Sequence, residues 1–100
     1  IIDYNKLQSL DTIAATLNLE PLCEKIRAFG AHVIEVDGHD HAALNDALSF
    51  QSDCKPIVII AHTVKGKGVS FMENRVEWHY KSPNVEEISI ALREINKSNA

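Results

Sequence analysis

The sequence predicts an α/β fold, an open parallel sheet with helices on both faces. Residues 57–61, Ile-Val-Ile-Ile-Ala, are apolar without alternation, which is what a parallel strand covered on both faces requires. Residues 32–36 form a second β-branched segment, and stretches with helical periodicity lie before, between and after the two. Strands that alternate with helices at the crossover length of βαβ units are typical of an open parallel sheet.

The first residues predict the end of a strand and a turn. Ile1 and Ile2 are typical of the tail of a strand that starts in a longer chain, so we expect the upstream half of this domain to lie outside the 100 residues. Residues 3–8 then predict a turn. Residues 8–18 show no strong period and predict an irregular covering loop.

A helix is expected over residues 20–29. Leu22, Ile26 and Phe29 have near-helical spacing, Pro21 suits the first turn, and Gly30 suits a left-handed cap at the end. The β-branched residues 32–36 follow and predict a strand, because turn-forming residues lie on both sides of them.

A second helix is predicted to open at Asp40 or His41, and Lys55-Pro56 breaks the chain before the central strand 57–61. Residues 64–83 predict a long loop, and a loop of that length inside a compact domain is usually functional. A last amphipathic helix follows. The apolar stripes of the two helices are Ala43, Leu44, Ala47 and Leu48, and Val85, Ile88, Leu92 and Ile95.

The composition names no activity, but it disfavours several classes of partner. The hydrophobic fraction of 45% and charged fraction of 24% are ordinary for a globular domain. Because the formal net charge is −4 and the basic residues are scattered, no nucleic acid is expected. The longest apolar run is far below the ~20 residues that span a bilayer, so no membrane is expected. Cys23 and Cys54 lack zinc or redox spacing, which favours a reducing cytoplasm.

Three loops follow predicted strands, and in such sheets ligands bind beyond the carboxyl ends of the strands. In the first loop, the side-chain amide of Asn5 and the carbonyl of Leu7 are oxygen donors of the kind that Mg²⁺ accepts. The alternative is that Asp3 and Asn5 only cap a turn. Both interpretations stay open from the sequence alone.

The second loop, residues 37–40, joins a glycine to a helix N-terminus, which can attract an anion. The alternative needs no ligand: Gly38 supplies a positive φ angle and Asp40 caps the helix. Gly66-Lys67-Gly68 in the third loop allows close approach of the backbone to a ligand but lacks the spacing of a P-loop. A tight solvated turn is an equal alternative there.

His79 lies within the long loop, between Trp78 and Tyr80. A histidine in this position can donate to a diphosphate oxygen or carry a proton near neutral pH. The alternative is that it is simply an exposed loop residue.

Six segments of the chain match one family in order and spacing, residues 19–22, 27–30, 36–40, 55–56, 63–73 and 78–79. They resemble transketolase, especially the N-terminal subunit of transketolases split over two chains. The resemblance covers nearly the whole chain and identifies residues 1–100 as the C-terminal portion of a diphosphate-type thiamine-diphosphate-binding domain. It implies that Asn5 ligates Mg²⁺ or Ca²⁺ by its side chain and Leu7 by its carbonyl. It further implies that His79 contacts the cofactor diphosphate or the reacting centre.

The resemblance implies an enzyme that moves a two-carbon ketol unit from a ketose to an aldose, with sugar phosphates as substrates. A pyrimidine-binding domain or subunit would complete the site in a homo- or hetero-oligomer, so the isolated chain would be inactive. Two positions depart from the pattern, since Asp11 and Tyr80 stand where relatives often have glycine. Deoxyxylulose phosphate synthase, an α-keto acid dehydrogenase component and a non-catalytic assembly module are the alternatives.

Overall fold

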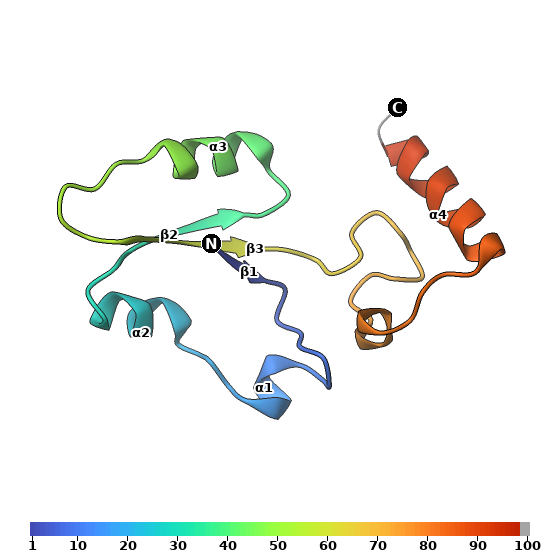
Figure 1. Cartoon of the computed structure of the whole chain (residues 1–100), viewed down its shortest axis with the longest axis horizontal. Helices are drawn as coiled ribbons and strands as arrows, with labels where there is room; N and C mark the ends of the chain where they lie inside the picture. The colour runs from blue at the N-terminus through green and yellow to red at the C-terminus, as the bar shows by residue number, and fades with distance from the viewer. Residues whose placement is uncertain (99–100) are drawn as a thin grey trace.

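The computed structural model describes residues 1–98. Strands β1 (Ile2–Tyr4), β2 (His32–Asp37) and β3 (Ile57–His62) form a parallel sheet in the order β1-β3-β2. Figure 1 shows helices on both sides of this sheet, α2 (Leu22–Ala28) below it and α3 (His41–Ser49) above it. The predicted fold class and the central position of the last strand are therefore confirmed.

The core explains why the central strand has no polar alternation. Ile60 has no exposed surface and packs with Tyr4 of β1 and Leu22 of α2. Its neighbour Ile59 is directed to the other face of the sheet, beside Ala47 of α3, and is only 5% exposed. Because each face of β3 is covered by a different helix, consecutive residues must all be apolar.

The helix boundaries follow local capping chemistry. The first predicted helix begins at Leu22 rather than at residue 20, because Pro21 is its N-cap. Gly30 has a φ of 92°, so the left-handed cap is confirmed. At α3 the Asp40 carboxylate accepts the backbone N–H groups of Ala42 and Ala43 at 2.9 and 3.1 Å, which confirms that Asp40 is the cap.

The predicted covering loop contains one element that the sequence pattern did not reveal. Helix α1 (Ile13–Thr16) is a single turn, and the Thr12 hydroxyl caps it by accepting the N–H of Ala15 at 3.2 Å. Ile13 packs against the core. One turn is too short to display a helical period, so hydrophobic spacing could not predict it.

A long loop follows β3 and contains one 3-10 turn, η1 (Val76–His79), before helix α4 (Val85–Ser98) begins. In Figure 1 this loop separates α4 from the sheet. The predicted helix is confirmed, but much of its apolar stripe is exposed, with 86% of Val85 and 55% of Leu92 accessible to solvent. None of the helices within residues 1–98 has the length and apolar character needed to cross a bilayer.

Candidate functional site

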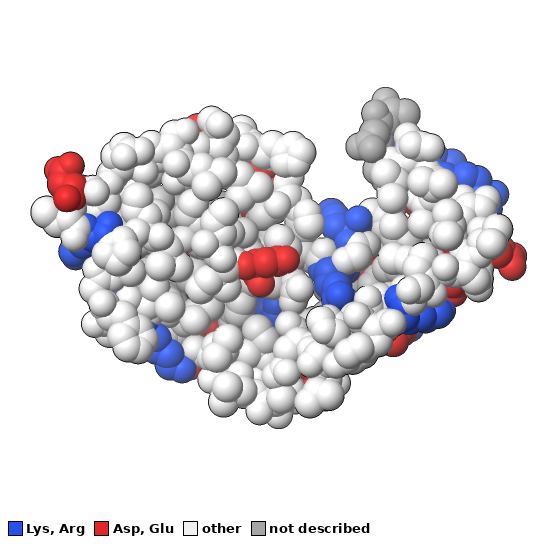
Figure 2. All heavy atoms as spheres, viewed as in Figure 1, with Lys and Arg blue, Asp and Glu red and all other residues white. Residues whose placement is uncertain are grey.

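A cavity of about 1100 Å³ lies at the carboxyl edge of the sheet, where the three loops after β1, β2 and β3 meet. The meeting of these loops confirms the location expected for parallel strands. Figure 2 shows basic side chains at the hollow between the sheet and the C-terminal loop. The cavity wall includes Lys6 and Lys67, which offer positive charge to an anionic ligand, and also the carboxylates of Glu20 and Asp37.

Asn5 and Leu7 both line this cavity. The Asn5 Oδ1 atom accepts the Leu7 N–H at 2.9 Å, and Lys6 between them has a φ of 62°, which makes a tight turn. Asn5 therefore caps this turn, whereas Asp3 accepts the Thr63 hydroxyl instead. The cap uses one of the two lone pairs of the amide oxygen, so the other is left for a cation. A preoriented amide oxygen and a nearby main-chain carbonyl fit Mg²⁺ as part of an oxygen shell.

The part of the chain that the structure describes contains no group of three or more His, Cys, Asp or Glu side chains placed to hold a metal ion. The nearby Asp3 carboxylate already accepts the Thr63 hydroxyl. A cation held by Asn5 and Leu7 would therefore need phosphate oxygens, water or ligands from outside this segment to complete six-coordination.

The turn after β2 is built by close approach rather than by an unusual backbone angle. Gly38 is not among the residues with positive φ, so that expectation was wrong. A Cβ at Gly38 would lie 2.4 Å from Cγ2 of Thr63, which explains the glycine. Here His39 places its Nε2 atom 2.8 Å from the Val64 N–H, a contact that sequence reasoning missed because its partners are far apart in the chain.

The turn at Gly66-Lys67-Gly68, after β3, is tight. This agrees with the tight-turn alternative drawn from the sequence. Gly66 has a φ of 73°, and a Cβ there would lie 2.7 Å from the backbone of Met72. The Val69 N–H donates to the Gly66 carbonyl at 3.1 Å, which closes the turn. Lys67 at its centre lines the cavity, so the turn also contributes charge to the site.

His79 is not among the residues that line this cavity. It is exposed at the end of η1, with its ring edge-on to Tyr80 at a centroid distance of 4.7 Å. The neighbouring Trp78 is anchored, since its Nε1 donates to the Phe71 carbonyl at 2.9 Å. The structure thus brings Asn5 and Leu7 together in one wall and leaves His79 outside it.

A polar network extends from His62 in the cavity wall to Glu35 and Cys23. This network was not predicted from the sequence. The Glu35 carboxylate lies 3.0 Å from Nε2 of His62, and its pKa is lowered by hydrogen bonds from Cys23 and His62. The same bond to Glu35, together with burial, raises the pKa of Cys23 to about 11. The thiol therefore stays protonated at neutral pH and is no nucleophile.

Tyr4 closes the network toward α2. Its hydroxyl donates to the Glu20 carboxylate, and this bond, with burial, raises the pKa of Tyr4 to about 12. The Tyr4 ring also meets His62 edge-on at 5.6 Å. Tyr4, Glu20 and His62 all line the cavity, so its floor is made of side chains that are held in place by one another.

Comparison with known proteins identifies related chains. No protein-family model matches the sequence. The chain is 45% identical over 96 residues to one subunit of the apulose-4-phosphate transketolase of Actinobacillus succinogenes, covering 95% of this chain and 35% of that protein. It is 39% identical over 101 residues to 6-deoxy-6-sulfo-D-fructose transketolase subunit SqwG of a Clostridium species, covering 98% of this chain and 36% of that protein.

Human transketolase is 36% identical over 81 residues, which is 81% of this chain and 13% of the human protein. The chain thus spans about a third of the length of the transketolase subunits that it matches, 35% and 36% in the two cases above. The resemblance drawn from the sequence is confirmed: over nearly its whole length, this chain is homologous to a segment of the transketolases.

Proposed function

We propose that this chain is the C-terminal portion of a thiamine-diphosphate-binding domain, in an enzyme that transfers a two-carbon ketol unit from a ketose to an aldose phosphate. The observation that carries the proposal is the cavity at the carboxyl edge of the sheet, with Asn5 and Leu7 side by side in its wall. The segment that builds this wall is homologous to transketolase subunits, which supports a cofactor site there.

In this proposal Asn5 and the Leu7 carbonyl hold Mg²⁺ or Ca²⁺, and the cation anchors the diphosphate of the cofactor. Thiamine diphosphate, when bound, supplies the carbanion chemistry that breaks and forms the carbon–carbon bond. The chain itself binds and orients. Lys6 and Lys67 in the cavity wall offset the negative charge of the diphosphate. His79 lies outside this wall, and its contact with the diphosphate or the reacting centre stays a prediction from the family resemblance.

The site needs a second component. Several relatives are named as single subunits of a transketolase, which supports a partner that carries the pyrimidine-binding domain. We propose a cytoplasmic hetero- or homo-oligomer that acts on sugar phosphates, and an isolated chain without activity. The open cavity agrees with this arrangement, because it leaves one side of a bound cofactor for the partner to cover.

Isothermal titration with thiamine diphosphate and Mg²⁺ tests the proposal, on the chain alone and mixed with a pyrimidine-domain protein. We expect heat of binding in the mixture that vanishes when Mg²⁺ is removed with a chelator. Asn5→Ala should weaken this binding by roughly 10- to 100-fold, the loss typical of removing even a supporting partner of a metal site. Asn5→Asp keeps both an acceptor for Leu7 and a metal ligand and should retain binding.

Asn45→Ala is the matched control, because Asn45 is an exposed residue of α3 and does not line the cavity. Its affinity should equal that of the unmodified chain. Equal binding by Asn5→Ala would show that the cation is held elsewhere. No heat with or without the partner would favour a non-catalytic assembly module instead.

A further inference from the structure

The loop that follows β3 is held by a side chain of β1 and by a side chain of the turn that follows β2. On one side the Thr63 hydroxyl donates to the Asp3 carboxylate of β1. On the other side the Val64 N–H donates to Nε2 of His39, which follows β2, at 2.8 Å. The cavity wall formed by Val64 and Lys67 therefore begins at a point that two hydrogen bonds fix.

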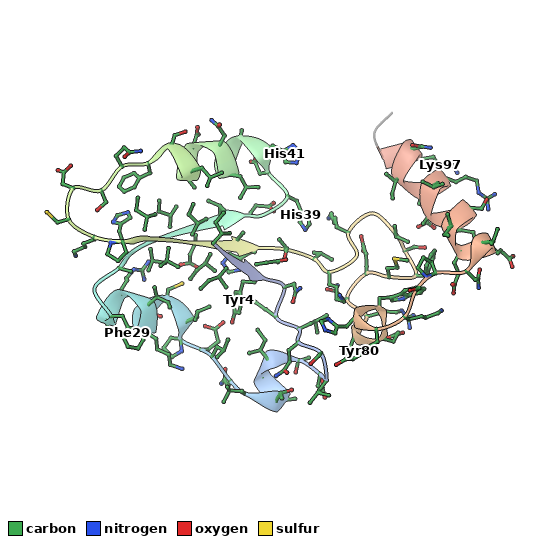
Figure 3. The ribbon with its side chains drawn as sticks, viewed as in Figure 1. Tyr4, Phe29, His39, His41, Tyr80 and Lys97 are labelled. Atoms are coloured by element: carbon green, nitrogen blue, oxygen red, sulfur yellow. The ribbon has the colours of Figure 1, made fainter. Side chains whose placement is uncertain are left out.

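His39 is itself held firmly at its backbone. Its N–H donates to Oδ1 of Asp37 at 2.8 Å, and the preceding Gly38 N–H donates to the His62 carbonyl at 2.8 Å. The absence of a Cβ at Gly38 lets this turn touch Thr63. Figure 3 shows His39 between the end of β2 and the loop that leaves β3. The backbone of His39 is therefore fixed, and its imidazole lies next to that loop.

The direction of the bond determines the state of the imidazole. A backbone N–H can only donate, so Nε2 of His39 must be unprotonated and the ring proton must sit on Nδ1. A protonated imidazole has a donor on both nitrogens and no acceptor. In that state two donors would face each other at this position and the bond to Val64 would be lost.

We propose that His39 is a positioning residue that helps to hold the Val64–Lys67 wall of the cavity while its imidazole is neutral, so that acidification loosens the wall at Val64. The inference rests on the proposed function only in one respect, namely that the ligand of the cavity is a magnesium-bound diphosphate. In this proposal the position of Lys67 in the cavity wall depends on the hydrogen bond that His39 accepts.

Other titratable and charged groups surround the cavity and must be separated from His39. Protonation of His62 would strengthen its contact with the Glu35 carboxylate, so that histidine does not explain a release. His39→Gln isolates the imidazole, because glutamine can present an acceptor oxygen but does not titrate. The remaining groups are Lys6, Glu20, Asp37 and Lys67 in the cavity lining, Asp3 behind Thr63, and Asp40 and His41 at the start of α3.

Nuclear magnetic resonance on the 100-residue chain without cofactor tests the proposal. At pH 8, long-range proton–nitrogen spectra should show the Nδ1–H tautomer of His39. Between pH 8 and pH 5, a range in which histidines take up a proton, exchange of the Val64 amide, corrected for intrinsic rates, should accelerate about five- to tenfold. The Ile60 amide in β3 should stay unchanged as an internal reference.

His39→Gln should show slow Val64 exchange that does not depend on pH, and His39→Ala fast exchange at both pH values. An Nε2–H tautomer at pH 8, or the same pH profile in His39→Gln as in the unmodified chain, would overturn the proposal. The glutamine variant decides the matter even if the alanine variant fails to fold. Cofactor titration at pH 8 is a separate measurement, so a failure of the proposed function is distinguished from a failure of the His39 bond.

Discussion

Residues 1–62 and residues 63–98 are stabilised in different ways. The first region has a ladder of parallel strands and a core centred on Ile60. The second has no strand, and apart from the buried Val69 and the contact between the Phe71 and Trp78 rings, it is held largely by individual polar contacts. Trp78 donates to the Phe71 carbonyl at 2.9 Å, and the Ser70 N–H donates to the Glu94 carboxylate at 2.6 Å. A repeating apolar pattern is enough to build the sheet region, whereas the C-terminal region depends on particular side chains.

The candidate site takes one wall from each region. Asn5 and Leu7 belong to a turn attached to the sheet, and Lys67 belongs to the loop. We therefore expect the wall formed by Asn5 and Leu7 to be rigid and the wall that carries Lys67 to respond to local changes. Four measurements test the contrast between residues 1–62 and residues 63–98, beginning with the largest expected effect.

Ile60→Ala should lower the free energy of unfolding by roughly 2–5 kcal/mol, because it leaves a cavity in the centre of the sheet region. Urea unfolding followed by circular dichroism measures the change. Ile88→Ala in α4 is the matched control, since Ile88 is 44% exposed and its loss should stay within about 0.5 kcal/mol. Similar losses for both variants would contradict the contrast between the two regions.

Gly66→Ala and Gly68→Ala separate steric collision from backbone strain in the loop. Both glycines have positive φ, 73° and 88°, so each alanine should cost about 1 kcal/mol in strain. Only Gly66 has a neighbour in the way, the Met72 backbone at 2.7 Å, and its variant should lose at least about 1 kcal/mol more. Thermal unfolding measures the stability lost by each variant. An equal loss for both variants would show that the Met72 backbone does not restrict the residue at position 66.

Asp40→Ala should lower the free energy of unfolding by about 1 kcal/mol, because two N–H groups at the start of α3 lose their acceptor. Asp46→Ala, on the exposed side of the same helix, should change it by less than about 0.5 kcal/mol. Urea unfolding of both variants is the measurement. A loss confined to Asp46→Ala would show that α3 is stabilised by surface charge instead of by its cap.

The smallest effect is a pH dependence of the contact between the loop and α4. The Ser70 N–H and hydroxyl lower the pKa of Glu94 below the ordinary glutamate value of 4.5. Because the folded pKa is the lower one, the stabilisation is complete above the unfolded pKa and is lost as the pH falls through the folded pKa. Ser70→Ala keeps the N–H but removes the hydroxyl, so the pKa of Glu94 should rise part of the way toward 4.5.

Carboxyl-carbon NMR titration of Glu94 measures this shift. Ser82→Ala, an exposed loop position, provides the control and should leave the titration unchanged. An unaltered Glu94 titration in Ser70→Ala would mean that the hydroxyl takes no part in the contact.

Much of the sheet region was predictable because its signals are local or periodic. The β-branched run 57–61 indicated a strand buried on both faces, Gly30 a left-handed cap and Asp40 a helix start. The placement of Asn5 and Leu7 near a cavity also followed, because carboxyl ends of parallel strands share one edge. Their role as metal ligands stays a prediction.

The sequence by itself determined the order of the elements, the central strand and the edge at which a ligand site should form, since these depend on hydrophobic periodicity and chain direction. Only the tertiary structure decided which distant side chains meet. The bond between His39 and Val64, the Glu35 contacts, the fit of Gly38 against Thr63 and the exposure of the α4 stripe are of this kind. Each depends on the distance between segments far apart in the chain, and local spacing carries no information about that distance.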